Sequence, residues 1–311
     1  MPTPLRLSLK TLRAFACVVE QGSITAAAAQ LNTAASAIAA ALDQVEDEFG
    51  ASLLIRTRAR GIAPTPEGRD MAIRFRALLD QYDRVLESGH SLTQSLSGTL
   101  RIGYYAPVAP AFLPSVLGPI LAQNPDLQLT LHEHDNDSAQ DALLAGQLDV
   151  ILFAGHDLRR GIITSHLLDL PPYVLTPAGH ALSYHAQISL HDLALYPLVL
   201  LDRPLARPYV EGLFQQQGLS PRIAAHADST EMVRSLVGAG AGLAGLAMRP
   251  LTTITYGGHA LACTPLAKDQ PGLQLLTGHA TPQPRKLVTA FLDALHIWMG
   301  SDTARLLTVS P

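Results

Sequence analysis

The sequence predicts an α/β protein that begins with a small all-α domain and continues as two α/β lobes. Three observations predict this arrangement. Gly22 and Gly50 divide the first fifty residues into short helical segments, the segment after Pro66 has the pattern of one long helix, and strands alternate with helices from Thr99 onward. At 311 residues the chain is long enough for more than one hydrophobic core.

Composition predicts a soluble, cytoplasmic protein. Hydrophobic residues make up 48% of the chain and charged residues 15%, and no apolar run reaches the roughly 18 residues of a membrane-spanning helix. The first residues, MPTPLRLSLKTL, lack the apolar segment and cleavage spacing of a secretion signal. Cys17 and Cys263 lie far apart in the chain and are expected to be reduced, buried thiols. We therefore expect no membrane and no disulfide.

The N-terminal segment predicts three short helices. The first begins at Ser8 and ends at Gly22, Ser23 caps the second, and a short connection through Asn32 and Thr33 leads into the third. Apolar residues at core spacing are Leu9, Leu12, Phe15, Ala16 and Val19 in the first helix and Ile38, Leu42, Val45 and Phe49 in the third. A tight turn between the second and third helices indicates a helix-turn-helix.

The segment IRTRARGIAPTP, which follows Leu54, has the composition of a β-wing beside a helix-turn-helix. The net charge of the whole chain is −4, but six arginines and only two acidic residues lie within residues 56–76. Positive charge is therefore local, as expected for a small basic surface rather than for a chain that coats nucleic acid.

A long helix is expected to run from Pro66 to about Leu96. Its apolar residues follow alternating steps of four and three: Met71, Phe75, Leu78, Tyr82, Val85, Leu92 and Leu96. This is the heptad spacing of a coiled coil, which buries its apolar stripe only against a partner helix. The spacing predicts a dimer.

The remainder predicts βαβ units and a mostly parallel sheet, with ligands at the carboxyl ends of the strands. The expected strands are TLRIGYY, LQLTLHE and DVILFA in a first series, PYVLTP, PLVLLD, RIAAHAD and GLAGLA in a second, and finally LQLLTGH. The last strand and the helix PRKLVTAFLDALHIW are expected to return to the first sheet. Two crossings between the lobes predict a hinged cleft.

These segments together resemble the LysR-type transcriptional regulators. The resemblance at the N-terminal end rests on GSITAAAAQL, SAIAAALDQVEDEFG, LLIRTRARG and PTPEG, and further along on GQLDVILFAG, PAGHAL and LVGAGAGLAG in matching order. It covers nearly the whole chain.

The resemblance implies a winged helix-turn-helix domain over residues 1–65 and a linker and dimerisation helix over 66–97. It further implies a two-lobed effector domain similar to periplasmic binding proteins, with lobe I over 98–167 and 268–300 and lobe II over 168–267. The implied partners are double-stranded promoter DNA, a small-molecule effector, a second copy of the chain in a homodimer or homotetramer, and RNA polymerase.

The third helix departs from the family pattern because alanine replaces the polar residues expected on a recognition helix. Ten of the sixteen residues from Ala26 to Ala41 are alanine. Base recognition would then depend on methyl contacts, DNA shape and half-site spacing, and affinity on phosphate neutralisation by arginines. The candidate DNA-binding residues are Ser23, Thr25, Thr33, Ala34, Ala35, Ser36, Ala39, Arg56, Arg58 and Arg60. The alternative is a tightly packed bundle with a solvated arginine face.

Candidate effector-binding residues lie at strand ends and helix starts that face the expected cleft. They are Tyr105, Ala106, His134, Asp202, Arg203, His226, Ser229 and Thr230. Ser229 and Thr230 could equally be an ordinary helix cap. Few charges near the cleft suggest a small, aromatic carboxylate as the ligand.

No cofactor, metal or catalytic site is expected. His132 and His134 form only one local pair, whereas a metal site needs three or four converging ligands. Residues 240–245 match GxGxxG but follow a helix and open a strand, the reverse of dinucleotide binding. A cytoplasmic solute-binding protein is the main alternative function, and an enzyme using the cleft is a second.

Overall fold

The computed structural model describes residues 7–57, 61–90, 96–155, 157–267 and 270–309, without the side chains of 57, 84 and 87–90. The chain forms two compact units, which are residues 1–94 with 145–147, and residues 95–144 with 148–311. We refer to them as the N-terminal unit and the C-terminal unit.

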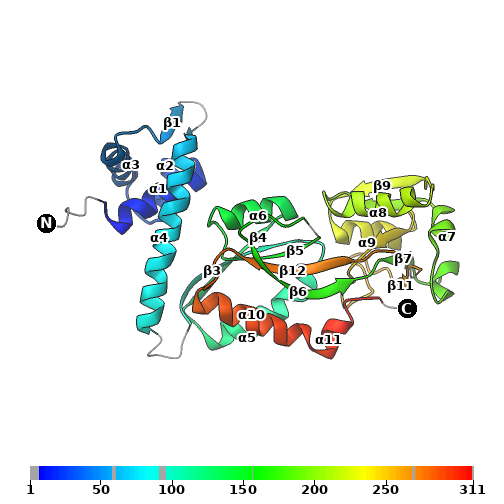
Figure 1. Cartoon of the computed structure of the whole chain (residues 1–311). Helices are drawn as coiled ribbons and strands as arrows, with labels where there is room; N and C mark the ends of the chain where they lie inside the picture. Colours follow the sequence, from blue (N-terminus) through cyan, green and yellow to red (C-terminus); the bar gives the residue numbers. More distant parts are fainter. Residues whose placement is uncertain (1–6, 58–60, 91–95, 156, 268–269, 310–311) are drawn as a thin grey trace. The chain divides into compact units, whose positions relative to one another are not determined.

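The N-terminal unit contains three helices, a two-stranded wing and a long helix (Figure 1). The helices are α1 (Leu9–Gln21), α2 (Ile24–Gln30), α3 (Ala35–Phe49) and α4 (Pro66–His90). As predicted, Ser8 caps α1 by accepting a hydrogen bond from the backbone N–H of Thr11, and Ser23 caps α2 in the same way. Both α1 and α3 end at a left-handed glycine, Gly22 or Gly50.

The turn between α2 and α3 is closed by Asn32. It is the single non-glycine residue with positive φ (49°) in the described part of the chain, and asparagine tolerates this conformation better than most residues. The next residue, Thr33, donates its backbone N–H to the carbonyl of Ala28 at 2.9 Å. Among the described residues no single helix could cross a membrane; α2 and α3 pass that test of length and composition only as a pair bent by 111°.

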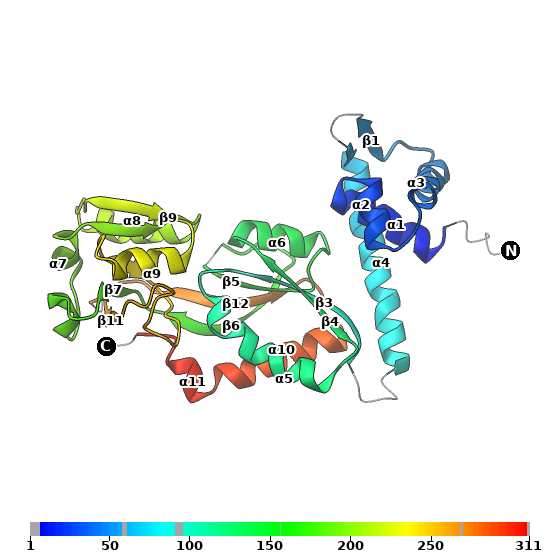
Figure 2. The same cartoon turned by 180° about the vertical axis from the view of Figure 1, so that it is seen from behind.

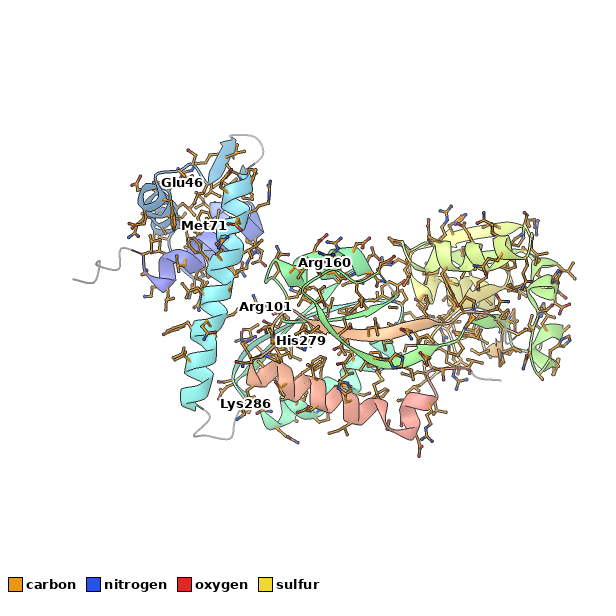
Figure 3. All side chains as sticks on the ribbon, in the orientation of Figure 1. Glu46, Met71, Arg101, Arg160, His279 and Lys286 are labelled. Carbon is orange, nitrogen blue, oxygen red and sulfur yellow. The ribbon has the colours of Figure 1, made fainter. Side chains whose placement is uncertain are left out.

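The wing consists of β1 (Leu54–Thr57) and β2 (Gly61–Pro64), which pair antiparallel. Glu46 of α3, labelled in Figure 3, holds the base of the wing. Its carboxylate accepts the backbone N–H groups of Leu53 and Leu54 at 2.7 and 3.0 Å. Ile62 of β2 donates its N–H to the carbonyl of Gly22 at 2.9 Å. The wing is therefore fixed to both α3 and the end of α1.

Only part of the heptad stripe on α4 is available to a partner helix. Phe75 is buried and packs edge to face on Phe15 of α1, with ring centroids 5.5 Å apart. Leu78 and Val85 are 51% and 60% exposed. The first turns of α4 thus complete the core of their own unit, and the unpaired apolar stripe begins at Leu78. Leu92 of the predicted heptad lies outside the described residues. Leu96, predicted as the last heptad position, instead packs against the core of lobe I, so its assignment to this helix was wrong.

Lobe I of the C-terminal unit is built on a five-stranded mixed sheet of order β4-β3-β5-β12-β6. Its strands are β3 (Gly98–Tyr104), β4 (Leu127–Glu133), β5 (Val150–Ala154), β6 (Ile163–Leu170) and β12 (Leu273–His279). Its helices are α5 (Leu113–Gln123), α6 (Asn136–Leu144) and α10 (Lys286–Met299). Alternate residues of β5 face opposite cores, so α5 and α10 cover one face and α6 covers the other (Figure 2).

Lobe II contains a three-stranded antiparallel sheet and a parallel pair, joined by a bridge between Leu198 and Leu243. Its strands are β7 (Tyr173–Pro177), β8 (Leu198–Leu201), β9 (Ile223–Ala227), β10 (Ala244–Leu246) and β11 (Leu261–Pro265). Its helices are α7 (Leu190–Ala194), α8 (Ala206–Gln216) and α9 (Thr230–Gly238). Lobe II has two hydrophobic cores, one on each side of its strands. Helix α8 packs in one of these cores and α9 in the other.

The predicted fold class is confirmed, with two strands added. The sequence interpretation did not include β6, which pairs with β12, or β11, which pairs with β7. Both added pairings are antiparallel. The expected strands β5 and β12, and likewise β7 and β10, also pair antiparallel, so the prediction of a mostly parallel sheet was wrong.

The C-terminal tail also connects the lobes. After α11 (Asp302–Arg305), Leu307 is buried in the main core of lobe I and Val309 in a core of lobe II. Arg249 of lobe II donates to the carbonyl of Leu306 at 2.7 Å. The tail therefore adds a link beside the chain crossings that lead into β7 and into β12.

Candidate nucleic-acid interface and ligand pocket

The start of α3 presents a small and almost featureless exposed surface. Ala34, Ala35 and Ser36 are exposed, and Ala39 is half-buried one turn later. Ala34 is the N-cap residue and supplies no side-chain hydrogen bond to the first turn. The first N–H groups of α3 are therefore left for water or for an anion.

Two hydroxyl residues extend this surface on α2 and the turn. Thr25 and Thr33 are exposed, whereas the hydroxyl of Ser23 is engaged in capping α2. The start of α3, together with Thr25 on α2 and Thr33 in the turn, thus presents methyl groups and a few hydroxyls, with no charged side chain before Asp43. The predicted candidates from Ser23 to Ala39 lie on adjoining elements of one unit.

Arg56 of the wing is held by two carboxylates of α3. Its guanidinium lies 2.6 Å from Asp43 and 3.2 Å from Glu46, and the hydrogen bond to Asp43 raises the pKa of Arg56. Its positive charge is therefore largely offset by neighbouring negative charge. Arg58 and Arg60 lie outside the described residues.

Between the two lobes of the C-terminal unit lies an apolar pocket. Its lining comes from both lobes: Tyr105, Pro107, Val108, Ala154, Leu170, Leu201, Ala206, Tyr209, Val210, Thr230, Gly245, Leu246, Ala247, Met248 and Leu273. None of these side chains is charged. The cavity volume of about 30 Å³ holds a water molecule or two but no metabolite. A larger ligand would need the lining residues to move apart.

A polar group of four residues, which we call the rim cluster, adjoins this pocket. It comprises Tyr105 after β3, Glu133 and Asp135 at the end of β4, and Arg203 after β8. Arg203 of lobe II pairs with Glu133 of lobe I, and its Nε lies 3.6 Å from Oδ1 of Asp135. Burial raises the pKa of Tyr105, and the Asp135 carboxylate raises it further. The rim cluster links the lobes.

A second interlobe contact lies in the pocket wall. Tyr209 of α8 donates its hydroxyl to the carbonyl of Pro271, in the segment that crosses to β12, at 2.6 Å. Opening of the pocket must break or rearrange this bond as well as the ion pairs of Arg203.

The other predicted effector residues are spread around the pocket rather than gathered in it. Thr230 lines it, and Ala106 is half-buried beside Tyr105. His134 lies 3.1 Å from the Ser138 hydroxyl, and burial followed by the charge of His132 lowers its pKa. Asp202 pairs with Arg207 at 3.2 Å. His226 and Ser229 are exposed, and Ser229 caps α9.

Comparisons with known proteins agree with this architecture. Residues 9–69 match the family described as the bacterial regulatory helix-turn-helix protein, lysR family, and residues 93–299 match the LysR substrate binding domain. The chain belongs to the LysR family. This LysR-type transcriptional regulator thus combines a DNA-binding helix-turn-helix with an effector-binding domain.

Individual relatives show how far the similarity extends. The chain is 28% identical to the HTH-type transcriptional regulator TtuA of Agrobacterium vitis over 84% of its length and 90% of the relative's. It is 33% identical to a probable hydrogen peroxide-inducible genes activator of Streptomyces viridosporus, of which it spans 62%. The crystal structure of HinK, a LysR family transcriptional regulator from Pseudomonas aeruginosa, is similar with a TM-score of 0.60 and 30% identity, covering 94% of this chain and 99% of HinK.

Most residues that line the pocket of this LysR-family protein were not among the residues predicted from the sequence. Pro107, Val108, Leu246 and Met248 read as ordinary loop or core residues, and only the fold brings them to one place. The proline-rich stretch after β3 was an available signal, because it follows a strand at its carboxyl end. Among the described residues, no group of three His, Cys, Asp or Glu side chains is arranged to hold a metal.

Proposed function

We propose that this regulator is a homodimer or homotetramer that binds double-stranded promoter DNA through α2, α3 and the wing. The observation that carries the proposal is the exposed, uncapped start of α3, which has only methyl and hydroxyl groups. Such a surface fits closely into a major groove without presenting charged side chains. We also retain the predicted domain boundaries at residues 65, 97, 167 and 268 as part of this proposal.

Base recognition in this proposal is sparse. The methyl groups of Ala35 and Ala39 contact thymine methyl groups, and the hydroxyls of Thr33 and Ser36 reach bases or phosphates. Phosphates also meet the free N–H groups at the start of α3. Sequence preference then depends on DNA shape and half-site spacing.

Affinity in this proposal comes mainly from Arg58 and Arg60. Arg56 contributes less because Asp43 and Glu46 already offset its charge. Neutralising phosphates releases counterions, so binding should weaken steeply as salt rises.

The apolar stripe of α4 supports self-association. Leu78, Tyr82, Val85 and Leu86 are exposed on a helix whose first turns are already packed in its own unit. A second α4 would bury this stripe by heptad packing. Two protomers would also present two copies of α3 to successive half-sites.

The effector in this proposal is a small molecule bound between the lobes. It acts by binding one arrangement of the lobes more tightly than another, which shifts their equilibrium and the geometry of DNA contact. The apolar pocket and the interlobe contacts of Arg203 and Tyr209 support this assignment.

Three further parts of the proposal concern the wider role. The pocket catalyses no reaction, the protein acts in the cytoplasm, and RNA polymerase is a partner on the promoter. The alternative of a solute-binding protein does not account for the helix-turn-helix match over residues 9–69.

Selection of bound fragments from a random DNA pool tests this proposal. We expect an enriched sequence with two half-sites spaced by about one or more helical turns, roughly 10 base pairs each. Light scattering should give an even number of protomers on that DNA. Recovery of no preferred sequence, or binding of one protomer to each fragment, would contradict the proposal.

A further inference from the structure

Asp43 places a negative charge on the face of α3 that begins with Ala35. It lies four residues after Ala39 and eight after Ala35, so the three residues lie along one side of the helix. Asp43 is exposed, as Ala35 is. A carboxylate on this side of the helix repels the phosphates of an approaching duplex.

Asp43 is not needed to hold the wing in place. Glu46 does this, because its carboxylate accepts the backbone N–H groups of Leu53 and Leu54. Among the described residues, the side chain of Asp43 has one polar contact, which is the hydrogen bond that it accepts from Arg56 at 2.6 Å. The side chains of Arg56 and Asp43 are 46% and 57% exposed, and exposed ion pairs contribute little to stability. The stability of the fold therefore does not explain this pair.

The wing directs Arg56 toward α3. Side chains alternate along a strand, so Arg56 lies on the same face of β1 as the buried Leu54, whereas Ile55 lies on the opposite face and is 52% exposed. The guanidinium of Arg56 therefore meets both Asp43 and Glu46. One positive and two negative charges leave this junction of wing and helix with excess negative charge.

Arg56 nevertheless keeps hydrogen-bonding capacity. Its Nη2 donates to both carboxylates, and within the described part of the chain its Nε and Nη1 have no partner. Guanidinium groups bind phosphate well through two parallel N–H donors. The carboxylate of Asp43 thus competes with DNA phosphate for this side chain.

We propose that Asp43 limits the affinity of this protein for DNA by holding Arg56 away from the phosphates. The inference rests on the proposed function, because it requires that α3 and the wing bind DNA. Phosphate neutralisation supplies nearly all of the affinity for DNA of arbitrary sequence. Asp43 therefore keeps the binding of such DNA weak.

Removal of the Asp43 carboxylate tests this inference. Full-length protein and Asp43→Ala are titrated at several salt concentrations with one fixed duplex of arbitrary sequence, so that no operator is needed. We expect Asp43→Ala to bind more tightly than the unchanged protein. The slope of log affinity against log salt should steepen by about 0.9 for each protomer bound, since each released Arg56 neutralises one more phosphate.

Two further variants show whether the effect depends on Arg56. The double variant Asp43→Ala/Arg56→Ala should have the same slope as Arg56→Ala, because no guanidinium is left to release. Asp47→Ala is the matched control, since Asp47 is exposed one turn further along α3 and has no ion pair among the described residues. This control should leave the slope almost unchanged.

Each result either supports the inference or overturns it. An unchanged slope in Asp43→Ala overturns it, as does equal steepening in Asp47→Ala or in the double variant. Weaker binding by Asp43→Ala also overturns it, because Asp43 would then orient Arg56 for a contact with DNA. The proposed function fails separately, if the unchanged protein selects no DNA sequence or binds as a single protomer.

Discussion

The start of α3 and the interlobe pocket are both surfaces for a partner, but they are constructed in opposite ways. The α3 surface is one continuous stretch of exposed small residues, with charge kept to the second half of the helix at Asp43, Glu46, Asp47 and Glu48. The pocket is assembled from segments between Tyr105 and Leu273, is apolar inside, and has charges paired at its rim. The α3 surface is suited to the regular groove of double-stranded DNA. The pocket is suited to a small molecule whose binding changes the arrangement of the lobes.

A group of three charged residues in lobe I is expected to show the largest effect on stability. Asp149 is buried between Arg101 and Arg285, at 2.8 and 2.9 Å. Asp149→Ala leaves two guanidinium groups without their shared partner, which should lower the free energy of unfolding by about 3–5 kcal/mol. Urea unfolding measures this, with Asp293→Ala as an exposed control expected to stay within about 0.5 kcal/mol. Similar losses in both variants would show that the triad does not stabilise lobe I.

A charge added to the α3 surface should weaken DNA binding without lowering the stability of the protein. Ala35→Asp places a negative charge where DNA phosphates approach, and a dimer carries the change twice, so we expect affinity to fall by about a hundredfold. The same aspartate complements the helix start and should not lower the melting temperature. Ala186→Asp, at an exposed loop position of lobe II, is the control in the same binding assay. Undiminished affinity in Ala35→Asp would remove α3 from the interface.

A change in the C-terminal tail should have an effect of intermediate size and tests whether the tail holds the two lobes together. Val309→Asp should detach the tail from lobe II and lower stability by about 1.5–2 kcal/mol, the value of one buried valine side chain. Leu306→Asp is a matched control because the Leu306 side chain is 53% exposed and its hydrogen bond to Arg249 uses the backbone. Thermal unfolding of both variants measures the difference. Equal effects would mean that the tail is not a link between lobes.

The smallest expected effect is an increase in the stability of the protein. Ala34→Ser supplies the missing N-cap hydroxyl of α3 and should raise stability by about 0.5–1 kcal/mol. Ala37→Ser, an exposed change within the first turn, should be neutral or slightly destabilising. A rise in melting temperature for Ala34→Ser alone sharpens the comparison, because it shows that this helix start is left uncapped at a cost in stability. No rise would show that the N–H groups are already satisfied.

The sequence was sufficient for the N-terminal unit because its signals are local. Serine caps set the starts of α1 and α2, and left-handed glycines set the ends of α1 and α3, within the chain itself. The heptad on α4 was partly misread, since its period does not say which residues serve the unit's own core: Phe75 packs on Phe15, whereas Leu78 stays exposed. Such a choice is tertiary and has no local signal.

The pocket was less predictable for the same reason. Tyr105 and Thr230 were proposed from strand and helix ends, and both line it. The partners of Arg203 are Glu133 and Asp135, which lie 70 and 68 positions earlier in the chain and in the other lobe. Likewise, the pairing of Arg56 with Asp43 depends on how the wing folds back on α3. Charge counts along the chain show neither pairing.

The salt dependence of DNA affinity tests the account of the α3 surface most directly. Full-length protein, Arg56→Ala and the double variant Arg58→Ala/Arg60→Ala are titrated with the selected DNA at several salt concentrations. The slope of log affinity against log salt should fall by about 0.9 for each phosphate that the variant no longer neutralises. We expect a clear fall in the double variant and little change in Arg56→Ala, whose guanidinium is paired with Asp43 and Glu46. An unchanged slope in the double variant, or an equal fall in Arg56→Ala, would contradict the account.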